Sequence, residues 1–263
     1  MLEKDILCAT DLTATSDNAV RAANAIAAHL ATRMTLLHVL NRSEQEEHER
    51  VVGVMNDQVA RGGTEGRTTH KLLEGDFMKR IAEETGQGHS LLVLATHGPH
   101  GLRQSLFGAD ILKLVRQSAI PSLVVQEGLK LEGLLQRIVL PVAAHADIDK
   151  LLDMVVALAK AFAADVHVFQ LMRPGESPSD DLLANKQRML LRLKTEGLRH
   201  EEVNEPSTTF SIGFAEPTIR YAQRVGAGAI AIMAHASDEY RYIADAEKER
   251  LLANDARIPI LCA

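Results

Sequence analysis

The sequence is poor in cysteine and has no surplus of cations. Its only two cysteines, Cys8 and Cys262, lie in apolar runs at opposite ends of the 263 residues. So few cysteines exclude a disulfide framework and are typical of a reducing compartment. The 29 Lys and Arg residues are outnumbered by 35 Asp and Glu residues, which gives a formal charge of -6. A dedicated nucleic-acid binder needs excess cations to neutralise phosphates, so we expect no nucleic-acid partner.

Long apolar runs are also missing. No uninterrupted stretch reaches the roughly 18 apolar residues that are needed to span a bilayer. No basic segment followed by an apolar one precedes the first strand-like run. We therefore expect no membrane partner and a cytoplasmic location. With 46% hydrophobic and 24% charged residues, the chain can bury a core, which excludes disordered and fibrous proteins.

Short apolar runs alternate with amphipathic stretches along the whole sequence. In the first half, strand-like runs lie at residues 5–10, 34–40, 67–73, 91–95 and 122–126. Between them, apolar side chains spaced three and four apart predict helices at residues 16–31, 44–60, 76–85 and 108–117. This order is typical of an α/β fold in which a parallel sheet is flanked by helices.

The second half of the sequence repeats this order. Residues 138–142 correspond to residues 6–10, an offset of 132, whereas His97 and His235 are separated by 138. We place the six extra residues of the second copy in the Pro- and Ser-bearing stretch 173–179. The repeat predicts two tandem domains, residues 1–127 and 137–263, each with an open parallel five-stranded sheet. One large α/β domain with chance internal similarity is the alternative.

The candidate site lies in the loops after the first and fourth strands, because ligands of open parallel sheets bind beyond the carboxyl ends of the strands. Ala9, Thr10 and Asp11 offer a carboxylate and backbone polar groups after the first strand. After the fourth strand, a glycine-punctuated loop leads to Gly108 at the predicted start of a helix. Backbone N–H groups and the positive end of a helix dipole suit a phosphate ligand.

These loops resemble those of the universal stress protein family, and two such domains would cover nearly the whole chain. Family members with bound ATP share the pattern Gly, two residues, Gly, nine residues, Gly and then Ser or Thr, together with an Asp after the first strand. Here the nine-residue spacing from Gly98 to Gly108 is intact. Ala95 replaces the first glycine and Ala109 replaces the Ser or Thr. The resemblance implies a Rossmann-like, adenine nucleotide alpha hydrolase-like fold.

The resemblance also implies roles for individual residues. Asp11 would bind polar groups of the ribose or adenine, Val39 would line the adenine pocket, and Arg103 would add charge near the phosphates. The predicted nucleotide-binding residues are Ala9, Thr10, Asp11, Val39, Ala95, His97, Gly98, Arg103, Gly108 and Ala109. The missing hydroxyl at Ala109 removes one hydrogen bond of about 0.5 to 1.5 kcal/mol, which weakens binding without abolishing it. The ligand would be ATP with Mg²⁺, or AMP.

The second copy has lost more of this pattern. Ala143, Ala236 and Ala246 stand where the first copy has its aspartate and its two glycines, and Glu247 stands opposite Ala109. The carboxylate of Glu247 is expected to repel a nucleotide triphosphate. We therefore predict a degenerate C-terminal domain that does not bind nucleotide.

Two further patterns lack the neighbouring residues or elements that their usual function requires. His97 and His100 are three residues apart, but the next candidate metal ligand is Asp110, so we predict no metal site. Gly226 and Gly228 begin a string like a dinucleotide fingerprint, yet they precede a strand instead of following one.

The sequence thus predicts a universal stress protein that binds an adenine nucleotide through its N-terminal domain and is not an enzyme. An interaction module with both pockets vestigial is one alternative. An ATP hydrolase is another, against which stands the lack of a visible general base or pair of metal-binding carboxylates near the loop. The resemblance also implies that the fifth strands, residues 122–126 and 259–262, pair within the chain as a pseudo-dimer, and that two chains form a homodimer.

Overall fold

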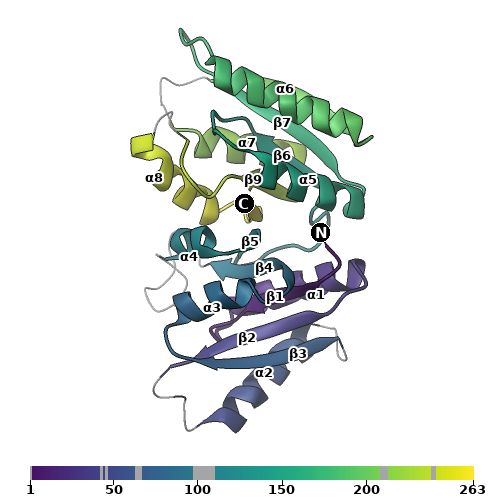
Figure 1. The fold of residues 1–263 in the computed structure, drawn as a ribbon, viewed down its shortest axis with the longest axis vertical. Coiled ribbons are helices and arrows are strands. Elements are labelled where there is room, and N and C mark those ends of the chain that lie inside the picture. The colour runs from purple at the N-terminus through teal and green to yellow at the C-terminus, as the bar shows by residue number, and fades with distance from the viewer. Residues whose placement is uncertain are drawn as a thin grey trace. The chain divides into compact units, whose positions relative to one another are not determined.

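The computed structural model describes residues 2–41, 44, 47–62, 67–96, 110–207, 213–237 and 241–263. The chain divides into two compact units, residues 1–131 and 132–263. Figure 1 labels most of the helices and strands of each unit. Strands and helices alternate along each unit.

The described part of the N-terminal unit contains five strands and four helices. They are β1 (Asp5–Ala9), α1 (Ser16–His29), β2 (Met34–Leu40), α2 (His48–Gly62), β3 (Thr68–Glu74), α3 (Phe77–Thr85), β4 (His89–Thr96), α4 (Ile111–Gln117) and β5 (Ser122–Gln126). The strands are parallel and lie in the order β3-β2-β1-β4-β5. The order in which successive strands are added to the sheet reverses between β1 and β4, so the carboxyl ends of these two strands flank the switch point.

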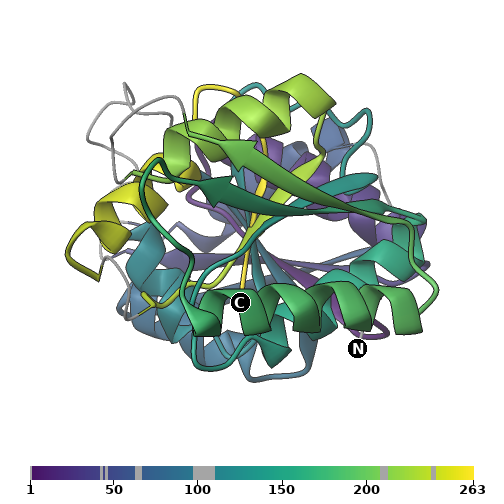
Figure 2. The ribbon, with the colours of Figure 1, turned by 90° about the horizontal axis from the view of Figure 1, so that it is seen from above.

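The C-terminal unit repeats this topology. Its described elements are β6 (Arg137–Pro141), α5 (Asp149–Phe162), β7 (Asp165–Met172), α6 (Asp180–Thr195), β8 (His200–Pro206), α7 (Ala215–Val225), β9 (Ala229–Ile232), α8 (Arg241–Leu252) and β10 (Ile260–Cys262). The parallel strands lie in the order β8-β7-β6-β9-β10. In Figure 2, the green strands of this unit lie between α6 on one side and the yellow-green α7 on the other. The predicted fold class, two open parallel five-stranded sheets flanked by helices, is confirmed.

Burial explains why the central strands read as continuous apolar runs. Ile6, Leu7, Cys8 and Ala9 of β1 are all fully buried, because helices cover both faces of a parallel sheet. Both cysteines are buried free thiols, Cys8 in β1 and Cys262 in β10. The outer strands β3 and β8 keep exposed positions along their length.

The structure corrects the position of the six extra residues in the C-terminal unit. The connections 41–47 and 173–179 are equally long, and the end of β3 at Glu74 still corresponds to the end of β8 at Pro206 with an offset of 132. The offset changes only between β8 and α7, so the extra residues lie there. Pro and Ser in 173–179 indicate a loop, but the first copy has a loop of the same length at that place.

The second helix also begins later than predicted. Glu44 lies in a turn, where its backbone N–H donates to the carbonyl of Asn41 at 3.1 Å and to Asn41 Oδ1 at 3.2 Å. Helix α2 then starts at His48. The side chain of Asn41 thus gives the backbone an alternative to helix, as asparagine commonly does.

The glycine pair before β9 has a structural role. Gly226 ends α7 with a φ of +64°, a left-handed conformation that favours glycine. Gly228 lies so close to Gly133 that a Cβ atom would come within 2.0 Å of the Gly133 carbonyl oxygen. Both positions thus meet backbone requirements of the fold.

Candidate functional site

The carboxylate of Asp11 shapes the loop that follows β1. Its Oδ1 accepts hydrogen bonds from the backbone N–H of Thr13 at 3.1 Å, from the Thr13 hydroxyl at 2.6 Å and from the hydroxyl of Ser16. Leu12 takes a left-handed φ of +63° between them. All three of these bonds go to Oδ1, so Oδ2 of the partly exposed Asp11 can accept a hydrogen bond from a ligand.

Thr10 holds this loop against the neighbouring elements. Its hydroxyl donates to Oε1 of Gln58 at 2.8 Å and accepts from the backbone N–H of Leu12 at 3.0 Å. Its backbone N–H donates to the carbonyl of Leu37, and its own carbonyl accepts from Nδ1 of His38, both at 2.9 Å. All polar groups of Thr10 are thus bonded within the protein, which makes it a positioning residue.

Gln58 is a site residue that the sequence analysis missed. It is fully buried in α2, and its Nε2 donates to Oδ1 of Asp17 at 2.9 Å and to the carbonyl of Thr13 at 3.3 Å. Arg61 then donates to both oxygens of Asp17 at 2.9 and 3.1 Å. A single glutamine in an amphipathic helix carries no distinguishing signal, because its partners lie more than forty positions away.

The structure brings Ala9, Asp11, Val39 and Ala95 to the carboxyl ends of the adjacent strands β2, β1 and β4. Ala9 is fully buried, and Val39 and Ala95 are 5% and 3% exposed. Ala9 therefore presents no accessible surface to a ligand and lies behind the surface of the site. The remaining predicted residues, His97, Gly98, Arg103, Gly108 and Ala109, lie outside the described residues.

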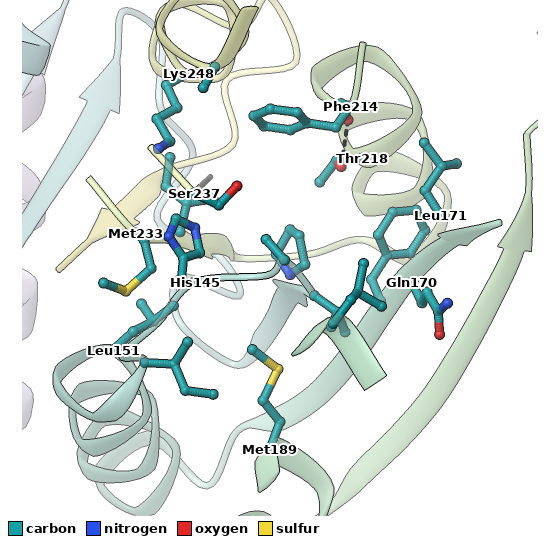
Figure 3. Close-up of a pocket in the computed structure, with 18 of the residues that line it drawn as sticks. His145, Leu151, Gln170, Leu171, Met189, Phe214, Thr218, Met233, Ser237 and Lys248 are labelled. Atoms are coloured by element: carbon teal, nitrogen blue, oxygen red, sulfur yellow. Dashed lines mark hydrogen bonds between the residues drawn. The ribbon is translucent and has the colours of Figure 1, made fainter. Parts of the chain in front are cut away.

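The corresponding corner of the C-terminal unit contains a cavity of about 110 Å³ (Figure 3). Its lining includes Ala143, Leu171 and Met233, which occupy the positions of Asp11, Val39 and Ala95 in the first unit. Lys248 also lines it, where the first unit has Asp110. The cavity therefore lies where the sequence places the ligand site of the first copy, but its chemistry differs.

Asn185 of α6 holds the loop after β6, whose residues Ala143 and His145 line this cavity. Its Nδ2 donates to the carbonyl of Ala143 at 2.9 Å and to that of His145 at 2.8 Å. Gln58 of α2 does the same for the loop after β1, where it bonds the carbonyl of Thr13. An amide side chain from the second helix thus positions the first loop in both units.

Glu247 is placed differently from what its sequence position suggests. It is buried, and its Oε2 accepts a hydrogen bond of 2.7 Å from the backbone N–H of Ala215 at the start of α7. It is not among the described residues that line the cavity. Its carboxylate satisfies a helix end, a place where backbone donors and the dipole favour a negative charge.

Two further properties concern metals and membranes. Within the described residues, no three His, Cys, Asp or Glu side chains gather so that they could hold a metal ion. Among those residues, no helix is both long enough and apolar enough to cross a membrane.

Comparison with known proteins finds relatives of this fold in one family. The sequence model of the universal stress protein family matches residues 3–126. No curated protein matches the chain. A solved universal stress protein from Archaeoglobus fulgidus DSM 4304 is 13% identical, with a TM-score of 0.73 over 99% of this chain and 96% of that one. A structure from Pseudomonas aeruginosa UCBPP-PA14 assigned to the same family is 16% identical, with a TM-score of 0.62 over 98% and 92% of the two chains.

The structural likenesses extend over both units, whereas the family match lies in the first. At these identities the solved structures show a shared fold and nothing about ligands. The match over residues 3–126 therefore assigns the N-terminal unit to the universal stress protein family, and both units share the fold of solved structures that carry this family's name.

Proposed function

We propose that this universal stress protein binds an adenine nucleotide through its N-terminal domain, residues 1–127, and acts in a stress response without being an enzyme. The observation that carries the proposal is the geometry of Asp11. Three donors hold its Oδ1 at the switch point of the sheet, while the partly exposed carboxylate keeps Oδ2 for a ligand hydroxyl. Charge-assisted hydrogen bonds of this kind are among the stronger ones.

The other contacts follow from the positions of the strands. The largely buried Val39 would pack against the base with the small part of its surface that remains accessible. Backbone groups of Ala95, Gly98, Gly108 and Ala109 would hold the phosphates, with Arg103 adding positive charge. AMP or ATP fits this set of donors, and ATP would bring Mg²⁺ held by its own phosphates and water.

We propose that the C-terminal domain, residues 137–263, does not bind nucleotide. Ala143 lacks the carboxylate of Asp11, and Met233 puts a long apolar side chain where the first domain has Ala95. The cavity of about 110 Å³ is also below the roughly 300 Å³ at which clefts for larger ligands begin. These features predict that a nucleotide is excluded because the cavity is too small and because the polar partners of the first domain are missing. The exclusion requires no contribution from Glu247.

Assembly and location complete the proposal. We propose that β5 and β10 pair edge to edge within the chain, since unpaired strand edges invite association, and that two chains form a homodimer in the cytoplasm. Light scattering of the purified protein would give the mass of the assembly, and a monomeric mass would refute the homodimer.

The test of nucleotide binding needs no assumption about which nucleotide is bound. Freshly purified protein is denatured, the released small molecules are separated by chromatography, and the protein is then titrated with Mg-ATP and AMP by calorimetry. Released adenine nucleotide or saturable binding supports the proposal. Neither release nor binding at millimolar nucleotide would favour the alternative, an interaction module with vestigial pockets.

A pair of matched variants locates the site. Gly108→Glu places a negative charge at the predicted phosphate position and is expected to abolish nucleotide binding. The equivalent change in the other domain, Ala246→Glu at an exposed position, should leave binding unchanged. Binding that survives Gly108→Glu would mean that nucleotide binds elsewhere.

A further inference from the structure

The C-terminal cavity has the properties of a ligand site in its own right. Figure 3 shows Leu151 and Met189 on its lower side and Phe214 and Leu171 on its upper and right sides. The cavity of about 110 Å³ is smaller than the apolar cavity of about 150 Å³ that is known to bind benzene, so the part of a ligand that it encloses is no larger than a small ring or a branched chain. The body of a fitting ligand is therefore apolar and small.

The opposite wall is polar and positively charged. His145, Ser237 and Lys248 lie together on the left of the view in Figure 3. Lys248 is 4% exposed, and its Nζ donates to the carbonyl of His235, which orients the ammonium group. Arg173 also lines the cavity, and its guanidinium pairs with Glu176 at 3.9 Å, so Lys248 is the cation on which the inference depends. A buried ammonium beside a low-dielectric wall attracts an anion more strongly than one in water.

None of the described residues that line the cavity is an aspartate or a glutamate. Relative to the first domain, Asp11 has become Ala143 and Asp110 has become Lys248, so both replacements make the corner more positive. The site has exchanged a carboxylate that accepts hydrogen bonds for an ammonium group that donates them.

We propose that the C-terminal cavity binds a small organic acid, with an aromatic or branched aliphatic body among Phe214, Leu151 and Met189 and its carboxylate against Lys248. This ligand differs in class from the nucleotide proposed for the first domain. The inference is independent of nucleotide binding, because every residue that it uses lies in the second unit.

Methionine methyl groups give a site-specific readout. Met189 and Met233 line the cavity, whereas Met55 and Met78 are buried in the first unit. Protein labelled at its methionine methyl groups is titrated with benzoate and, separately, with benzamide, its neutral relative of similar shape. We expect benzoate to shift the signals of Met189 and Met233 in a saturable manner, and benzamide to bind at least tenfold more weakly.

Two variants test separately the positive charge of Lys248 and the space within the cavity. Lys248→Met should weaken benzoate binding at least tenfold, and Ala143→Leu should abolish it by filling the mouth of the cavity. Lys160→Met is the control, because Lys160 pairs with Glu196 and is not among the described lining residues. Gly108→Glu should bind benzoate like the natural protein even where it no longer binds nucleotide.

The comparison of ligands on the natural protein needs no variant, so a variant that fails to fold does not remove the test. Equal affinity for benzoate and benzamide would overturn the role of Lys248. No shift of Met189 and Met233 at millimolar benzoate, or shifts confined to Met55 and Met78, would overturn the site itself.

Discussion

Glu247 and Ala215 are joined by a hydrogen bond of 2.7 Å in which the backbone N–H at the start of α7 donates to the carboxylate. In the first domain the equivalent helix is capped locally, because Asp76 accepts from the backbone N–H of Lys79 at 2.9 Å. The second domain has Phe214 at the position of Asp76 and turns it toward the cavity. A distant glutamate has thus taken over the cap, while the local position has become apolar.

Removing this distant cap should destabilise the C-terminal domain. We expect Glu247→Ala to lower its free energy of unfolding by about 1 to 2 kcal/mol, since a buried N–H loses its acceptor and the helix loses a favourable charge. Glu247→Gln retains an acceptor and should cost less. All three tyrosines lie in this half of the chain, so tyrosine fluorescence in urea follows this domain. Glu249→Ala, at an exposed neighbour, should change little, and an equal loss there would refute the capping role.

The local cap of α3 should contribute a similar free energy to the stability of the N-terminal domain. We expect Asp76→Ala to lower the free energy of unfolding by about 1 kcal/mol. Asp76→Ser should retain most of this stability, because serine is also a good N-cap residue. Hydrogen exchange of the amide of Lys79 measures the effect directly. Asp110→Ala is the control, since Asp110 precedes α4 without a side-chain capping bond. Unchanged protection of Lys79 in Asp76→Ala would contradict the assignment.

The carboxylate of Asp11 and the hydroxyl of Ser16 that donates to it can be tested separately. Asp11→Ala should weaken nucleotide binding by about 10- to 100-fold, which corresponds to the loss of a hydrogen bond to a charged group worth about 1.5 to 3 kcal/mol. Ser16→Ala removes one donor to Oδ1 and keeps the carboxylate, so we expect a loss of only a few-fold. Calorimetric titration with Mg-ATP measures both. A larger loss in Ser16→Ala than in Asp11→Ala would assign the ligand contact to the hydroxyl.

The buried thiols should make stability depend on alkaline pH. Burial raises the pKa of Cys262 to about 12, partly opposed by Lys248, and also raises the pKa of Cys8. Above pH 9 the unfolded chain releases these protons and the folded chain retains them, so the stabilising difference present below pH 9 is lost as the pH rises towards 12. The slope approaches about 1.4 kcal/mol per pH unit for each thiol.

Cys262→Ala should reduce that slope for the C-terminal domain, measured by urea unfolding with tyrosine fluorescence between pH 8 and about 10. The absolute stability of the variant also changes, so only the slopes are compared. In the natural folded protein neither thiol should react with a thiol reagent, because both are fully buried. Rapid reaction of either thiol under native conditions would contradict this.

Two glycines should respond to alanine in opposite directions. Gly228→Ala forces a Cβ against the carbonyl of Gly133 at 2.0 Å, so we expect a loss of more than 2 kcal/mol, as for other overpacked sites. Gly53 lies in α2 with open space around it, and Gly53→Ala should stabilise the N-terminal domain by about 0.5 to 1 kcal/mol. Thermal unfolding followed by circular dichroism measures both. A stable Gly228→Ala variant would mean that the β9 connection shifts to make room.

The repeating order of strands and helices could be predicted from the sequence because it rests on local periodicity. Continuous apolar runs such as Ile6 to Ala9 indicate strands that are covered on both faces. Parallel strands joined by helices then place Asp11 and the carboxyl end of β4 at the same edge of the sheet. The composition of 173–179 was a poor guide to the extra residues, because it indicates a loop and says nothing about its length relative to the other copy.

The sequence by itself therefore determined the fold class, the repeat and the edge of each sheet at which ligands can bind. Only the tertiary structure decided which distant side chains meet there. Gln58 with Thr10, Asn185 with the loop after β6, and Glu247 with α7 are contacts between segments that lie up to 48 positions apart. No local pattern encodes such pairs, because they depend on how helices pack over a sheet. For the same reason, the sequence predicted only that the second domain lacks a nucleotide site, whereas the structure showed a cavity with Lys248 on its wall.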